Sequence, residues 1–222
     1  MHQHNSDPDE DHPSGEQYFA PQPQADSAPR EVIWRLPGGP VRLWTDHGMF
    51  APGRVDRGTD LLARTMDLPP EGEILDLGAG YGPLALAAAL RWPAARLTLV
   101  EINQRAAALA ERNLQLHGVE NAEVLVGDAH EVLGERRFDA VICNPPLRSG
   151  KVAVLRLLTA AAARLRPGGA LWLVVRTAQG AKTLARDLGP HFSAVETVEI
   201  RGGYRVFRAT VDRDRSPGGE EQ

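Results

Sequence analysis

The feature that most constrains the fold is a regular alternation of apolar and helix-like segments that begins after Pro69-Pro70. Apolar strands separated by helices are typical of a mostly parallel sheet that helices cover on both faces. The last two strands are separated only by Arg-Gly-Gly, so we expect them to pair antiparallel, with one strand reversed at the end of the sheet. The sequence therefore predicts an α/β fold with seven strands. Expected strands are 74–77, 96–101, 122–126, 138–143, 170–175, 193–200 and 204–209, and expected helices are 83–91, 103–117, 151–165 and 178–188.

A small extension precedes this core, and a polar tail flanks the domain at each end. Segments 32–36 and 41–44 surround a Pro-Gly-Gly-Pro turn, which is typical of a β-hairpin, and 56–66 is expected to form a short helix. The tails contain too little apolar surface to offset the entropy lost on ordering, so we expect them to be disordered. The expected organisation is a tail at 1–30, a hairpin and helix at 31–70, a core at 71–209 and a tail at 210–222.

Composition limits the class of protein further. With 222 residues, 42% hydrophobic and 24% charged, the chain is expected to form one soluble domain. One cysteine excludes an internal disulfide, and we see neither a secretory signal peptide nor an apolar run of the roughly 18 residues that a membrane helix needs. A cytoplasmic location is therefore expected. The tails are acidic and the domain is slightly basic, which permits a nucleic-acid partner.

A glycine-rich loop, Asp76-Leu-Gly-Ala-Gly-Tyr-Gly82, joins the first core strand to the first core helix. Glycines at such a place let the backbone turn tightly and approach a ligand. The loop fails the dinucleotide pattern G-x-G-x-x-G, because Pro83 stands where a third small residue is required. It is not a phosphate-binding Walker loop, because no Gly-Lys-Ser/Thr follows. A glycine turn without any ligand is the alternative interpretation.

The loop resembles motif I of the class I methyltransferases, which have a Rossmann-like fold and use S-adenosylmethionine. The resemblance implies that Asp76 holds the ammonium of this cofactor, directly or through water. Glu101, at the end of the next strand, can accept both ribose hydroxyls, as in dinucleotide folds; its alternative is an exposed strand end. Asp128 would contact the adenine amine, unless it only caps a short helix. The implied cofactor-binding set is Asp76, Gly78, Ala79, Gly80, Gly82, Glu101, Ile102, Asp128, Ala129 and Asn144.

Asn144-Pro-Pro-Leu147 follows the fourth core strand, so it lies at the carboxyl edge of the sheet, where ligands bind. The prolines fix the backbone and remove N–H donors. The Asn144 side-chain oxygen and the Pro145 carbonyl can each accept one N–H of a planar amine, which orients the nitrogen for methyl transfer. The tetrapeptide resembles motif IV of methyltransferases that act on such amines, and we expect Asn144, Pro145, Pro146 and Leu147 to form the catalytic segment. An ordinary turn is the alternative.

Leu147 departs from this motif, which carries tyrosine or phenylalanine at that position. Phe50 or Tyr204 could supply an aromatic ring instead. Cys143 could act as a thiol in pyrimidine methylation, but a small buried apolar side chain is the stronger interpretation. The histidines show no spacing for a metal or a catalytic triad, so no metal is expected.

Further segments resemble the RsmC-like family, whose named members methylate guanine N2 in small-subunit ribosomal RNA. The resemblance covers roughly 31–209 and is similar to a single-domain form, because larger members carry an additional N-terminal half. It implies that Phe50 and residues 56–59, Thr59 included, line the cofactor pocket. The matching segments are 45–50, 56–59, 76–84, 144–151 and 203–206.

Basic side chains cluster near the expected active edge, where they could contact RNA phosphates while an unpaired base enters the pocket. A solvated charged rim without RNA is the alternative. The set is Arg148, Lys151, Arg176, Lys182, Arg201 and Arg205.

Three hypotheses remain at this point. The first is an enzyme that methylates guanine N2 in ribosomal RNA, alone or within a ribosomal subunit. The second keeps the enzyme but changes the acceptor to adenine N6, a protein glutamine or a small molecule. The third is a non-catalytic RNA- or ribosome-binding module that retains the cofactor fold.

Overall fold

The computed structural model describes residues 26–47, 53–146 and 150–214, and its centre is a seven-stranded sheet in the order β5-β4-β3-β6-β7-β9-β8. Every strand is parallel to its neighbours except β9, which pairs antiparallel with β7 and with β8. The predicted fold is confirmed. The strands are β3 (Glu73–Leu77), β4 (Arg96–Glu101), β5 (Ala122–Val126), β6 (Phe138–Cys143), β7 (Leu165–Arg176), β8 (Ala194–Arg201) and β9 (Tyr204–Thr210).

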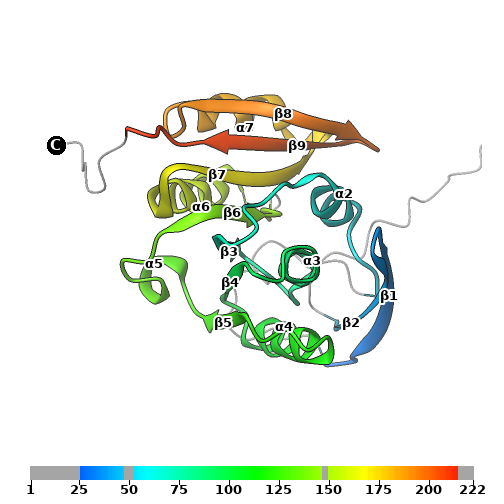
Figure 1. Ribbon diagram of the computed structural model, residues 1–222. Coiled ribbons are helices and arrows are strands. Elements are labelled where there is room, and N and C mark those ends of the chain that lie inside the picture. The colour runs from blue at the N-terminus through cyan, green and yellow to red at the C-terminus, as the bar shows by residue number, and fades with distance from the viewer. Residues whose placement is uncertain (1–25, 48–52, 147–149, 215–222) are drawn as a thin grey trace, which may run out of the picture.

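Helices cover both faces of this sheet (Figure 1). On one face, α2 (Arg57–Thr65), α3 (Pro83–Arg91) and α4 (Gln104–Leu116) enclose one apolar cluster. On the other face, α5 (Ala129–Val132), α6 (Lys151–Arg164) and α7 (Ala181–Leu188) enclose a second one. The sheet lies between the two clusters, so the buried strands are apolar on both sides. In the described part of the chain, no helix is both long and apolar enough to cross a membrane.

The main differences from the sequence-based expectation concern strand order and the residues at which segments begin. The reversed strand β9 lies one place in from the edge, because β8 forms the edge and the chain then turns back between β8 and β7. Strand β7 begins at Leu165 instead of 170 and is irregular before Ala170, where Gly168 has a φ angle of 78° and the pairing with β6 shifts register. Helix α7 begins at Ala181, after a 3-10 turn at Thr177–Gln179. Ordered structure also begins slightly before 31, where Ser27 hydrogen-bonds to Asp46.

A separate hairpin, β1 (Arg30–Leu36) and β2 (Gly39–Thr45), packs beside α4 (Figure 1). Asn113 of α4 is fully buried and joins three segments of the chain. Its side-chain oxygen accepts from the Trp44 N–H at 2.6 Å, and its side-chain nitrogen donates to the carbonyl oxygens of Trp44 (2.9 Å) and Tyr81 (2.8 Å). One amide therefore attaches the hairpin both to the helix and to the glycine loop.

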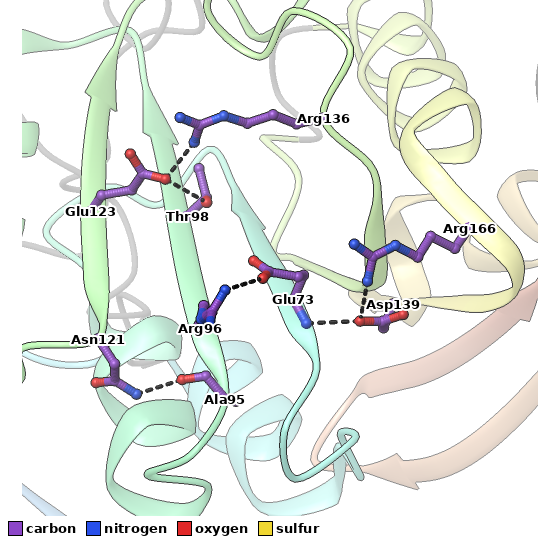
Figure 2. A network of polar contacts seen from close by, with 9 residues as sticks. All are labelled: Glu73, Ala95, Arg96, Thr98, Asn121, Glu123, Arg136, Asp139 and Arg166. Carbon is purple, nitrogen blue, oxygen red and sulfur yellow. Dashed lines mark hydrogen bonds and ion pairs between the residues drawn. The ribbon is translucent and has the colours of Figure 1, made fainter.

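Surface polar contacts fix the amino-terminal ends of the strands, opposite the edge where the expected site lies (Figure 2). The Asp139 carboxylate accepts from the Glu73 N–H at 2.8 Å and pairs with Arg166 at 2.7 Å. Arg96 pairs with Glu73, and Arg136 pairs with Glu123. Exposed pairs of this kind contribute about 0–1 kcal/mol each, so this edge is a suitable place for control substitutions.

We predict that Asn113→Ala lowers the free energy of unfolding by about 2–4 kcal/mol, because it leaves buried backbone groups of Trp44 and Tyr81 without partners. Urea unfolding followed by tryptophan fluorescence measures the loss. Gln115→Ala, at an exposed position of the same helix, is the control. Equal stabilities for the two variants would show that the amide is not needed to attach the hairpin.

Candidate functional site

The glycine loop between β3 and α3 adopts a backbone that L-residues with side chains rarely take. Gly78, Gly80 and Gly82 have φ angles of 72°, 58° and 81°. At Gly82 a Cβ atom would also lie 3.1 Å from the Cβ of Ala110, because α4 passes close to the loop. The N–H groups of Gly78 and Ala79 donate to the Val100 carbonyl at 2.9 and 3.1 Å. The loop is therefore fastened to the end of β4 while its outer side faces a cavity.

Glu101, the last residue of β4, fastens the same loop through its side chain. One carboxylate oxygen accepts from the Gly80 N–H at 2.8 Å, and the other accepts from the Asn103 N–H at 2.9 Å. Burial raises the pKa of this carboxyl, and the backbone hydrogen bonds partly oppose that shift. Glu101 is only 3% exposed, so the alternative of an exposed strand end is wrong.

Asp76, in β3, is a second buried carboxyl at this edge. It accepts a hydrogen bond from the Ala85 N–H at 3.0 Å, which caps the first turn of α3. Burial, with a smaller effect of the nearby Glu101 charge, raises the pKa of Asp76 to about 7. Neither carboxylate forms an ion pair with a described residue. Two buried acids without a cationic partner favour a ligand that carries positive charge.

A cavity of about 540 Å³ opens beside Glu101, within the size range of small-molecule sites. Most of its lining is apolar, so it suits a flat heterocycle between side chains. Asp128 caps α5 by accepting from the His130 N–H at 2.8 Å, and Arg156 lies 4.0 Å from its other oxygen. The helix-cap interpretation of Asp128 is thus observed, at the wall of the cavity. Its lining includes Leu77, Gly78, Val100, Glu101, Ile102, Asp128, Ala129, Pro146, Leu157 and Ala160.

Asn144, just after β6, lies in a smaller cavity shared with Asp76, Thr59 and the glycine loop. Its side-chain nitrogen donates to the Thr59 hydroxyl at 2.9 Å and to an Asp56 carboxylate oxygen at 3.2 Å. A carboxylate only accepts hydrogen bonds, so the amide nitrogen must face Asp56 and the amide oxygen must point the other way. The sequence indicated that this segment lines the pocket, but it gave no sign that Asp56 orients Asn144.

Tyr204 approaches the same carboxylate from β9. Its hydroxyl lies 3.4 Å from the other oxygen of Asp56, and the Arg176 side chain donates to that hydroxyl at 3.3 Å. The tyrosine ring also packs against α2, because a Cβ atom at Gly58 would lie only 2.9 Å from a ring carbon. Of the two aromatic residues expected near the target, Tyr204 therefore lies next to Asp56, the residue that holds Asn144. Phe50 lies outside the described residues.

The remaining predicted residues divide into three groups. Pro145 is buried and Pro146 borders the large cavity. Leu147 and Arg148 lie outside the described residues, while Lys151 and Lys182 are placed only as backbone positions in α6 and α7. Arg176, Arg201 and Arg205 lie at the same edge of the sheet, at the ends of β7, β8 and β9 that face the site.

Cys143 is fully buried at the end of β6, as the interpretation of a small apolar side chain requires. Burial and the neighbouring Asp76 charge raise the pKa of its thiol, which disfavours a reactive thiolate. Among the described residues, no three histidine, cysteine or acidic side chains gather as metal ligands would.

Comparison with known proteins gives a family match over most of the chain. The model of the family described as methyltransferase small domain matches residues 40–208. The uncharacterized protein YbxB of Bacillus subtilis is 31% identical over 196 residues, which cover 87% of this chain and 98% of that protein. Ribosomal RNA small subunit methyltransferase C of Ectopseudomonas mendocina is 34% identical over 84% of this chain and 56% of its own length.

Among solved structures, a 16S rRNA N2 methyltransferase, RsmC, of T. thermophilus in complex with AdoMet and guanosine superposes with a TM-score of 0.72. It is 30% identical, and the match covers 85% of this chain and 52% of that one. The chain thus spans about half the length of the methyltransferase C relatives and nearly the whole length of YbxB.

The raised pKa of Asp76 predicts that the ligand-free protein loses stability as pH rises from about 4 to 7. In that window the unfolded chain has lost the proton while the folded protein keeps it, and the shift of about three units corresponds to about 4 kcal/mol. Asp76→Asn removes the part of this dependence that comes from Asp76, while Glu101, whose pKa burial also raises, contributes in the same direction. Urea unfolding of both proteins across the window measures it, and parallel curves would contradict the prediction.

Asp46→Asn is the comparison variant. Burial raises the pKa of Asp46, but hydrogen bonds from Ser27 and Ala28 outweigh it and leave the pKa lowered. Its contribution to stability is present above the unfolded pKa and is lost only as pH falls below it. Asp46→Asn should therefore follow the wild-type curve in shape between pH 5 and 8, whereas Asp76→Asn should not.

Proposed function

The chain belongs to the methyltransferase small domain family, and we propose that it transfers a methyl group from S-adenosylmethionine to guanine N2 in small-subunit ribosomal RNA. The orientation of the Asn144 amide carries the part of this proposal that concerns transfer to a planar amine. Its nitrogen is committed to Asp56 and Thr59, which leaves its oxygen as an acceptor for the N–H of a planar amine.

The cofactor suits the large cavity in size and the buried acids in charge. The adenosine part suits the large apolar cavity, with its ribose hydroxyls on Glu101 and its adenine beside Ile102 and Asp128. The amino-acid part suits the glycine loop, with its ammonium near Asp76. S-adenosylmethionine carries a sulfonium, an ammonium and a carboxylate, so its net charge is +1, and the buried Asp76 carboxyl without a cationic partner favours the ammonium. When bound, it supplies a methyl group on a cationic sulfur.

The acceptor side is built by Asn144 and Pro145. The amine donates one N–H to the Asn144 oxygen and the other to the Pro145 carbonyl, which fixes the plane of the amine and aims its lone pair at the methyl group. The N–C bond forms as the S–C bond breaks, and the amine then releases one proton to solvent. The carbonyl oxygens stabilise the positive charge that develops on nitrogen. Tyr204 places an aromatic ring beside Asp56, which holds Asn144, and so is the candidate for the aromatic residue that Leu147 replaces.

The choice of guanine N2 rests on the relatives. Methyltransferase C proteins are about twice as long as the matched region, so the acceptor is the part of the proposal that most needs a direct test. Adenine N6, a protein glutamine or a small molecule would use the same Asn144 geometry. A non-catalytic binding module would not need the buried acids and the oriented amide to be present together.

The direct test is mass spectrometry of ribosomal RNA nucleosides from a strain that lacks the protein. We predict that N2-methylguanosine decreases and that the wild-type gene restores it. An unchanged amount of N2-methylguanosine would overturn the guanine assignment. Loss of a different methylated nucleoside would identify the acceptor and retain the enzyme.

We predict that Asn144→Ala lowers kcat by about a hundredfold or more, because it removes an acceptor that acts on the charge of the transition state. The affinity for S-adenosylmethionine, measured by calorimetry, should stay close to that of the wild type. Asn121→Ala, an asparagine at the opposite edge of the sheet (Figure 2), is the control and should leave kcat unchanged. Equal losses of affinity and turnover in Asn144→Ala would show a merely structural role.

A further inference from the structure

A second large groove, of about 640 Å³, lies next to the proposed active site and contains none of the cofactor-binding residues. The β1–β2 hairpin, the start of α2 and the β8–β9 turn form its walls, so segments far apart in the sequence meet there. Its lining includes five arginines and one acidic residue. These are Arg35, Arg54, Arg57, Arg64, Arg201 and Asp60.

The single acidic residue of this groove does not neutralise the positive charge of its arginines. Asp60 accepts from Arg64 at 2.9 Å and from the Trp34 ring N–H at 2.7 Å, so the single carboxylate is already committed. Arg35, Arg57 and Arg201 form no ion pair with another described residue. Several guanidinium groups held in one groove repel one another, and an anionic ligand would remove that cost.

Arg57 is a cation at the amino-terminal end of a helix, where positive charge does not stabilise the fold. It is the first residue of α2, where the helix dipole favours negative charge and disfavours a cation. Asp56 caps this helix end, but its two oxygens also serve Asn144 and Tyr204. A cation at this position is therefore better explained by a ligand in the groove than by the stability of α2.

Tyr204 and Asp56 link the groove to the oriented amide. Tyr204 lines the groove, and its hydroxyl lies 3.4 Å from Asp56, the residue that holds Asn144. Two side chains, Tyr204 and Asp56, thus connect the basic lining with Asn144. A strand whose phosphates lie among the arginines would place a neighbouring nucleotide at Asn144.

We propose that this groove binds the phosphate backbone of single-stranded RNA next to the target nucleotide. The proposal rests on the proposed function for the identity of the polymer. Guanidinium groups bind phosphates through paired N–H donors. Three of them in one groove without an ion pair to another described residue suit a polyanion better than one phosphate, namely Arg35, Arg57 and Arg201. A ring at the inner end suits stacking of an unpaired base, which must leave its helix to reach Asn144.

The groove differs from the rim that the sequence predicted. Only Arg201 belongs to both sets. Arg176 contacts Tyr204 at the inner end, and the side chain of Arg205 is partly buried beside the sheet, with its Nε atom enclosed. Residues from β1 and α2 replace the others, because the hairpin packs beside α2, where the Trp34 ring N–H donates to Asp60.

The test compares two double variants that each remove two positive charges. Arg57→Gln with Arg201→Gln removes charge from the groove. Arg96→Gln with Arg136→Gln removes it from the opposite edge (Figure 2). Binding of a short fluorescein-labelled single-stranded RNA is measured by anisotropy over a series of KCl concentrations, and binding of S-adenosylmethionine by calorimetry.

We expect the groove variant to bind RNA about tenfold more weakly at low salt, with a slope of log affinity against log salt that is shallower by about 1.4, or about 0.7 for each phosphate that an arginine no longer neutralises. Its affinity for S-adenosylmethionine should be unchanged, and the control variant should bind RNA as the wild type does. Equal weakening in both double variants would overturn the proposal, because it would show a general charge effect.

The same experiment separates this proposal from the proposed function. If the wild type methylates RNA and the groove variant binds RNA normally, the groove assignment is wrong and the function stands. If the groove variant loses RNA binding but no ribosomal nucleoside depends on the protein, the groove stands and the guanine assignment fails. A wild-type protein that binds no RNA would overturn the groove assignment.

Discussion

The carboxylate of Glu101 holds the rest of the site in place. It is the last residue of a buried strand, and its two oxygens accept backbone N–H groups from the glycine loop and from the start of α4. A buried carboxylate is costly unless it is hydrogen-bonded, so these contacts are needed for the fold as well as for a ligand. Because each oxygen has a second lone pair, the same group can fasten the loop and still accept a hydroxyl from the cavity.

Asp56 connects several segments on the acceptor side of the site, as Glu101 does on the cofactor side. It caps α2 through the N–H groups of Gly58 and Thr59, orients the Asn144 amide and receives the Tyr204 hydroxyl. These partners lie far apart in the sequence. One carboxylate thus sets the relative positions of the hairpin-side helix, the Asn-Pro-Pro segment and the antiparallel strand β9. Its removal would loosen three walls of the pocket together.

The predictable part of the molecule follows from local patterns. Periodicity predicted the strands and helices, and the glycine loop and Asn-Pro-Pro segment identified the active edge, because parallel strands place all their carboxyl ends together. The Asn113 contacts, the role of Asp56 and the arginine groove were not predictable. Each depends on how the hairpin and α2 pack against the core, and no local pattern specifies that packing. For Asp128 the sequence left two roles open, a helix cap and an adenine contact, and the structure shows the cap through the His130 N–H.

The structure places acidic and basic side chains on opposite sides of the proposed active site. Asp76 and Glu101 are buried behind the glycine loop, whereas the arginines line an open groove beyond Tyr204. A cationic cofactor and an anionic polymer would otherwise attract each other in the wrong arrangement, with phosphate against the sulfonium. Under the proposed function, the buried acids bind the cation where solvent does not screen it, and the exposed arginines hold the phosphates at a distance. The oriented Asn144 amide, held by Asp56, would then receive the amine between these two regions.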